Sequence, residues 1–301
     1  MQKNQTENIV CFGEVLWDML PDGAKPGGAP LNVAIHLKKQ GQTPALVSKI
    51  GDDREGRELI QFLKMAGLND AYIGTDKVLP TSTVLVHLDH NKNATYEICQ
   101  PVAWDNITAD QRTDELVANA DIIIFGSLAS RSEVTRNTLI QLLKNSDAKR
   151  VFDVNLRPPF DNREIVEPLL RLSDFIKLND EELEKIASWH NQSGKLRKLM
   201  QWVSAFYGCP EICVTRGPHG ALLLMNNTLI EHPGFKVEAA DTVGAGDSFL
   251  ASLVANLEKM HSPEKSLEYA CATGAFVASQ PGAVPDYSEK DIERLIQSSL
   301  V

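Results

Sequence analysis

Strand-like and helix-like segments alternate along most of this 301-residue chain, and this alternation limits its fold more than any other feature. In the second half, short apolar runs of strand length are separated by stretches with helical spacing. These runs are DIIIFGSL (121–128), RVFDVN (150–155), DFIKLN (174–179) and EICVTRG (211–217). A strand that is buried on both faces reads as a continuous apolar run. We therefore predict an α/β fold of three layers, with a mostly parallel sheet between two layers of helices.

The first half follows the same rhythm. An extended apolar stretch over 8–20 precedes a helix that Pro30 opens and that ends before Gly41. A strand over 44–51 then precedes a helix over 56–67, which Gly67 closes. These elements are expected to extend the same sheet.

Two regions lack a covering helix. Residues 78–99 alternate with period two on both sides of the polar turn DHNKN (89–93), which predicts a hairpin. Residues 220–240 have a second hairpin pattern that turns at Asn226 and Asn227. We predict one domain over 1–301, with a small β lid formed mainly by residues about 12–26 and 78–104.

Charge and cysteine content argue against several classes of function. The net charge of −10 is not offset by any basic stretch, so we expect no nucleic-acid partner. The first ten residues are polar and no apolar run is long enough to span a bilayer, so we expect a cytoplasmic protein without a membrane partner. Its five scattered cysteines favour buried thiols over disulfides. In such an acidic protein, a phosphorylated ligand would need a local binding site, formed for example by backbone N–H groups and a metal.

The stretch AADTVGAGDSFLASL (239–253) is the strongest candidate for such a phosphate-binding site. It is not a dinucleotide fingerprint, because Phe249 stands where the third glycine is needed and no strand follows to carry the ribose-binding acid. The phosphate-loop pattern G-x-x-x-x-G-K-[ST] is absent from the sequence. What remains is a glycine-rich turn that leads into a helix. Free N–H groups of Gly244, Ala245 and Gly246, together with the helix dipole, would bind an anion there.

Asp247 directly follows that turn, and two interpretations of it stay open. It could be an N-cap that accepts hydrogen bonds from its own helix. A carboxylate beside an anion site is unfavourable for binding alone, because like charges repel. It makes sense if the carboxylate takes a proton from a hydroxyl that then attacks a phosphorus atom.

Two long motifs resemble a known family. DTVGAGDSF (241–249) resembles the C-terminal signature of the ribokinase, or PfkB, family of carbohydrate kinases, and GGAPLNVAIHLKKQG (27–41) resembles its N-terminal signature. Between them, KLNDEE (177–182) resembles the family's N-x-x-E motif and VTRGPHGALL (214–223) its nucleotide segment. The resemblance covers essentially the whole chain. Within the family, GEVLWDMLP, GGAPLNVA and DVNLRPP most resemble fructokinases.

The resemblance implies a ribokinase-like sugar kinase that uses ATP and Mg²⁺ to phosphorylate a primary hydroxyl, with fructose as the expected substrate. It implies that Asp247 is the catalytic base and that Gly244, Ala245 and Gly246 form an anion hole for the γ-phosphoryl group. Among the remaining implied positions, the sugar-binding residues are Asp18, Gly27, Gly28, Asn32 and Arg157. The nucleotide-binding residues are Asn179, Thr215, Gly217 and Gly220, with Gly244 and Gly246 shared. Glu182 is implied to position Mg²⁺ through water, and Asp241 a monovalent cation such as K⁺.

Each of these residues also has a plain structural interpretation. Asp18 could be a turn aspartate, Asn32 a local cap, and Arg157 a surface arginine. The segment that starts at Asn179 could be an ordinary acidic first turn of a helix. Thr215, Gly217 and Gly220 could form a strand-to-hairpin turn.

The identity of the sugar also stays open. Leu31 and Cys271 depart from residues common in the family, and the lid lacks the arginine of many fructokinases. Ribose, ketodeoxygluconate and nucleosides are therefore alternative substrates, and a non-catalytic nucleotide or sugar sensor is the rival of another class. The exposed edges of the lid hairpin could pair in a homodimer.

Overall fold

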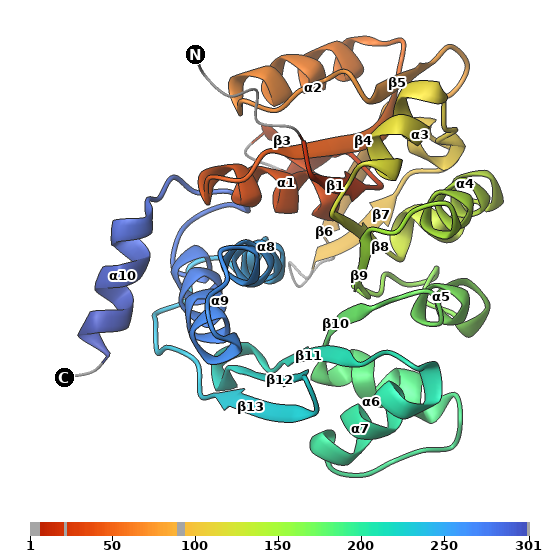
Figure 1. Ribbon diagram of the computed structural model, residues 1–301. Helices are drawn as coiled ribbons and strands as arrows, with labels where there is room; N and C mark the ends of the chain where they lie inside the picture. The colour runs from red at the N-terminus through yellow and green to blue at the C-terminus, as the bar shows by residue number, and fades with distance from the viewer. Residues whose placement is uncertain (1–6, 21–22, 89–93, 300–301) are drawn as a thin grey trace.

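The computed structural model describes residues 7–20, 23–88 and 94–299, and nine strands within these ranges form one sheet (Figure 1). In their order across the sheet they are β13 (Thr228–His232), β12 (Ala221–Met225), β11 (Glu211–Thr215), β10 (Phe175–Asn179), β9 (Lys149–Asp153), β8 (Ile122–Gly126), β1 (Ile9–Phe12), β4 (Pro44–Gly51) and β5 (Ile73–Asp76). Every neighbouring pair from β11 to β5 is parallel, and β12 is antiparallel to both of its neighbours, β11 and β13. The predicted mostly parallel sheet is confirmed.

Helices cover both faces of this sheet and enclose a separate hydrophobic core on each. One core is shared with α3 (Gln111–Ala118), α4 (Glu133–Lys144), α5 (Arg163–Leu170), α6 (Asp180–Ser188) and α7 (Leu196–Tyr207). The other is shared with α1 (Ala29–Lys39), α2 (Arg54–Met65), α8 (Ala245–Glu258), α9 (Pro263–Ala278) and α10 (Glu289–Ser298). The three-layer α/β/α prediction is therefore confirmed. No helix within the described ranges is both long and apolar enough to cross a membrane.

A second sheet of four strands stands apart from the first. Its order is β3 (Gly23–Gly27), β2 (Leu16–Leu20), β6 (Ser82–Leu88) and β7 (Ala94–Ile98). β6 pairs antiparallel with β7, as the period-two pattern predicts, and the expected turn at 89–93 lies outside the described residues. The extended stretch over 8–20 is divided, because Gly13 adopts a φ of 145° and β1 and β2 enter different sheets.

The hairpin of β12 and β13 turns where the sequence predicts it. Asn226 and Asn227 have φ values of 52° and 59°, the left-handed conformation that asparagine tolerates better than most residues. This hairpin extends the sheet edge beyond β11 and leads the chain back towards α8.

Candidate active site

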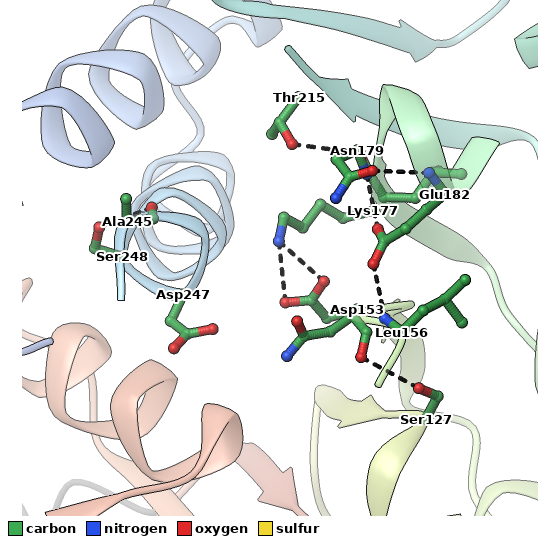
Figure 2. Close-up of polar contacts among 12 residues, drawn as sticks. Ser127, Asp153, Leu156, Lys177, Asn179, Glu182, Thr215, Ala245, Asp247 and Ser248 are labelled. Atoms are coloured by element: carbon green, nitrogen blue, oxygen red, sulfur yellow. Dashed lines mark hydrogen bonds and ion pairs between the residues drawn. The ribbon is translucent and has the colours of Figure 1, made fainter. Parts of the chain in front are cut away.

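Polar residues from several strands gather at the carboxyl ends of β9, β10 and β11, opposite the start of α8 (Figure 2). Asp153, Asn179 and Thr215 are the last residues of these three strands. Asn179 and Thr215 are partners in the register, so they lie side by side at the sheet edge. Ligands of open α/β sheets bind at this edge.

Asp247 lies in the first turn of α8, but it does not cap that helix. Gly244 occupies the N-cap position with a φ of 76°, and no side chain caps the helix. The carboxylate instead accepts a hydrogen bond from Nδ2 of Asn32, with Nδ2 and Oδ2 2.8 Å apart. Residues 215 positions apart in the chain are thus brought into direct contact. The capping interpretation of Asp247 does not describe this structure.

Burial raises the pKa of Asp247 to about 6, and the nearby carboxylate of Asp153 adds to the shift. The hydrogen bond from Asn32 and the charges of Lys177 and Arg157 act in the opposite direction. A carboxyl group with a pKa near 6 is ionised at neutral pH and still basic enough to accept a proton from a positioned hydroxyl.

The turn before Asp247 supplies backbone donors. Within the described ranges, the N–H groups of Gly244 and Gly246 have no acceptor, whereas that of Ala245 donates to the carbonyl of Thr242 at 3.3 Å. A Cβ on Gly246 would lie 3.2 Å from Nζ of Lys177, so this ammonium group borders the turn. The site therefore combines a helix N-terminus, unpaired N–H groups and a cation, all of which favour an anion.

Lys177 and Asp153 form a buried ion pair that the sequence analysis did not single out. Nζ of Lys177 lies 2.9 and 3.1 Å from the two carboxylate oxygens of Asp153, and the residues are 7% and 4% exposed. Burial alone would lower the pKa of Lys177, but the charges of Asp153, Glu182 and Asp247 outweigh burial and raise it. The available signal in the sequence was a charged residue between two apolar neighbours in each of two predicted strands.

Asn179 and Glu182 form a capping box at the start of α6. Oδ1 of Asn179 accepts from the N–H of Glu182 at 2.8 Å, and Oε2 of Glu182 accepts from the N–H of Asn179 at 2.9 Å. Oε1 of Glu182 also accepts from the N–H of Leu156 at 2.7 Å, which ties the loop after β9 to α6. Both carboxylate oxygens thus have backbone partners, although each keeps a second lone pair.

Four of the residues predicted to bind sugar lie on β2, on β3 and at the start of α1. A Cβ on Gly27 would collide with the carboxylate of Asp18, so the two residues are in contact. Gly28 has a φ of 112°, and a Cβ there would lie 2.5 Å from the carbonyl oxygen of Glu14. Asn32 is buried, and its Oδ1 has no hydrogen-bond partner among the described residues. An unpartnered acceptor beside Asp247 suits a sugar hydroxyl.

Two further charged residues lie near these four, namely Arg157, which is also predicted to bind sugar, and Glu14. The exposed Arg157 donates to the carbonyl of its neighbour Leu156 at 3.0 Å, and its charge lowers the pKa values of Asp18, Asp247 and Glu14. Burial acts in the opposite direction on Asp18 and raises its pKa overall. Glu14, which sequence reasoning missed, is 3% exposed, and burial raises its pKa to about 7.

The remaining predicted residues lie in loops near the sheet edge. Gly217 and Gly220 have φ values of 53° and 77°, and a Cβ on Gly220 would collide with the backbone of His232. Asp241 accepts from the N–H groups of Val243 at 3.0 Å and Gly282 at 3.1 Å, which joins the turn before α8 to the loop after α9. No cluster of three or more acidic, histidine or cysteine side chains within the described ranges could hold a metal ion.

Comparisons with known proteins give a family match over most of the chain. The model of the pfkB family of carbohydrate kinases matches residues 7–290. The chain is 31% identical to fructokinase-2 of Zea mays, over 92% of this chain and 90% of that protein.

Two solved structures share the fold. A fructokinase from Xylella fastidiosa with bound ATP superposes with a TM-score of 0.83 at 22% identity, over 97% of this chain and 99% of that one. A fructokinase from Vibrio cholerae O395, bound to fructose, ADP and calcium ion, gives a TM-score of 0.81 at 22% identity, over 97% and 100% of the two chains.

Proposed function

We propose that this chain, which belongs to the pfkB family of carbohydrate kinases, phosphorylates a primary hydroxyl group of fructose. Its activity as an ATP-dependent sugar kinase follows from the family, and the choice of fructose is supported by the maize fructokinase relative. The observation that carries the proposed mechanism is the 2.8 Å contact between Asn32 and Asp247. It joins an amide side chain proposed to bind the sugar to a carboxylate at the anion-binding end of α8.

In the proposed reaction, a carboxylate oxygen of Asp247 accepts the proton of the sugar hydroxyl. The hydroxyl oxygen bonds to the γ-phosphorus as the bond to the β–γ bridging oxygen breaks, and ADP leaves. The N–H groups of Gly244 and Gly246 would stabilise the charge on the transferring group, and the ammonium group of Lys177 borders them. Asp18, Gly27, Gly28, Asn32 and Arg157 would orient the sugar for in-line attack.

Asn179, Thr215, Gly217 and Gly220 would hold the nucleotide at the same sheet edge. Mg²⁺ would neutralise phosphate charge, and Glu182 is proposed to orient it through water, because Mg²⁺ keeps several water ligands. This fits a carboxylate whose oxygens already have backbone partners. Asp241 is proposed to support a monovalent cation, since it fixes the turn before α8.

A coupled assay of ADP release tests the substrate. We expect fructose to give the highest kcat/KM in a panel with ribose, ketodeoxygluconate and nucleosides, and we expect ADP release to depend on the added sugar. A higher kcat/KM for another member of the panel would replace fructose with that compound. If none of these compounds gives sugar-dependent ADP release, the result would instead support the alternative of a non-catalytic nucleotide or sugar sensor.

We also propose a homodimer through the second sheet. Met19 and Leu85 are register partners on one face of this sheet and remain 41% and 37% exposed. β3 and β7 are the edge strands of this sheet, and an edge strand can pair with a strand of a second subunit. Light scattering should show that Met19→Asp shifts the protein from dimer to monomer, whereas Val134→Asp, at a similarly exposed apolar position on α4, should leave the mass unchanged. A monomeric wild-type protein would disprove this interface.

A further inference from the structure

One face of α1 carries two polar residues, although the helix is buried from Pro30 to Leu37. These residues are Asn32 and His36, one turn apart and therefore on the same side of the helix. Asn32 contacts Asp247 and has a place in the proposed function. His36 is fully buried, and the proposed chemistry does not use it.

Both ring nitrogens of His36 are hydrogen-bonded. Nε2 lies 2.9 Å from the carbonyl oxygen of Ala283, and Nδ1 lies 2.9 Å from the hydroxyl of Tyr287. A carbonyl oxygen can only accept, so Nε2 carries the proton and Nδ1 accepts from the Tyr287 hydroxyl. Burial lowers the pKa of His36 to about 4, which keeps the ring in this neutral form at neutral pH.

Ala283 in turn packs against the turn before α8. A Cβ on Gly244 would collide with the backbone of Ala283, so the two segments are in direct contact. The neighbouring Gly282 donates its N–H to Asp241 at 3.1 Å, which joins the same loop to the same turn a second time. The loop after α9 therefore contacts both α1 and the turn before α8.

A second residue of α1 holds this loop. Nζ of Lys39 donates to the carbonyl of Pro285 at 2.8 Å and lies 3.2 Å from a carboxylate oxygen of Asp286. Lys39 is near the surface, whereas His36 reaches the part of the loop that contacts Gly244. His36 thus connects α1 to the anion-binding turn through this loop, in addition to the direct contact between Asn32 and Asp247.

We propose that His36 is a positioning residue. Through Ala283 it fixes the position of the Gly244–Gly246 turn relative to α1, the helix that presents Asn32 to the sugar. This inference rests on the proposed roles of Asp247 and the turn but not on the identity of the sugar. Loss of the link would leave the sugar contacts of α1 in place and displace the donors for the phosphoryl group. A displacement of about 1 Å at such a site can reduce turnover 10²-fold.

The test compares His36→Phe, which removes both hydrogen bonds, with His36→Gln, whose amide N–H can donate to Ala283. Turnover is measured with the sugar that the wild-type enzyme phosphorylates best, and sugar binding is measured by calorimetry without nucleotide. We expect His36→Phe to lower kcat about 10- to 100-fold with sugar affinity within about threefold of wild type. His36→Gln should recover most of kcat. His190→Phe, which removes a partly buried histidine that packs among the aromatic residues of α7, serves as the matched control.

Wild-type kcat in a folded His36→Phe enzyme would overturn the proposal. The proposal would also be overturned if the two His36 variants and His190→Phe lost kcat equally and in proportion to their loss of thermal stability. This result would indicate a purely structural role for His36. If His36→Phe does not fold, Tyr287→Phe decides, since it keeps the ring and removes the hydroxyl that donates to Nδ1. We expect Tyr287→Phe to lower kcat about two- to fivefold, and an unchanged kcat would then count against the link. A wild-type enzyme that prefers another sugar would refute the fructose proposal and leave this test intact.

Discussion

Replacement of Asp247 by asparagine is expected to lower kcat by about 10²–10⁴-fold while both substrates still bind. The asparagine keeps an oxygen that can accept from Nδ2 of Asn32, so the contact at 2.8 Å can persist, but the side chain can no longer take a proton. A coupled ADP assay gives kcat, and calorimetry gives the affinities for sugar and nucleotide. Asp114→Asn, an exposed substitution on α3, controls for the loss of one negative charge. A kcat within about threefold of wild type would remove Asp247 from the proton transfer.

The pH dependence provides a second signature of the same variant. Because the pKa of Asp247 is raised to about 6, kcat/KM of the wild type should fall below that pH, and Asp247→Asn should lack this limb. A raised carboxyl pKa stabilises the fold only at low pH, and this contribution is lost as pH rises through about 6. We therefore expect Asp247→Asn to resist urea better than wild type at pH 8, and this advantage should shrink towards pH 4. An unchanged acid limb would assign that ionisation to another group.

The sheet could be predicted from the sequence because its strands are buried on both faces. Each of the runs over 121–128, 150–155, 174–179 and 211–217 has an apolar centre, and stretches with helical spacing separate the runs. The division of 8–20 into two strands could not be predicted, because it depends on the conformation of Gly13 and on the contact of this residue with Pro30. Apolar residues predominate on both sides of the break.

The site was predictable only where its residues belong to long motifs. Asp247 and Asn32 stand in the two signatures, and the fold brings them within hydrogen-bond distance. Lys177 and Asp153 each stand between apolar neighbours in a strand, and their pairing depends on the alignment of β9 with β10, where they are register partners. Glu14 and His36 are single polar residues in buried segments, and their roles depend on partners far along the chain. Such residues carry no periodic signal.

The buried pair of Lys177 and Asp153 leads to the largest expected effect on stability. Lys177→Met would leave the carboxylate of Asp153 unpaired in a site where its residue is 4% exposed. We expect the free energy of unfolding in urea to fall by about 3–5 kcal/mol, because a buried charge without a partner has lost both water and its counter-ion. Lys185→Met, which breaks the more exposed pair with Asp161, should lower it by less than about 1 kcal/mol.

The double variant Asp153→Leu/Lys177→Met separates pairing from the mere presence of charge. If the loss in Lys177→Met comes from the unpaired carboxylate, the double variant should recover most of the free energy of unfolding, since apolar residues of similar volume replace buried ion pairs well. Its turnover should not recover, because the ammonium group that borders Gly246 is still missing. Stability that stays low in the double variant would mean that packing, and not charge, fixes this end of the sheet. Recovery of stability without turnover would mean that the pair matters for activity rather than for folding. In that case the ammonium group of Lys177 neutralises Asp153 in the free protein and also lies beside the turn proposed to receive the phosphoryl group.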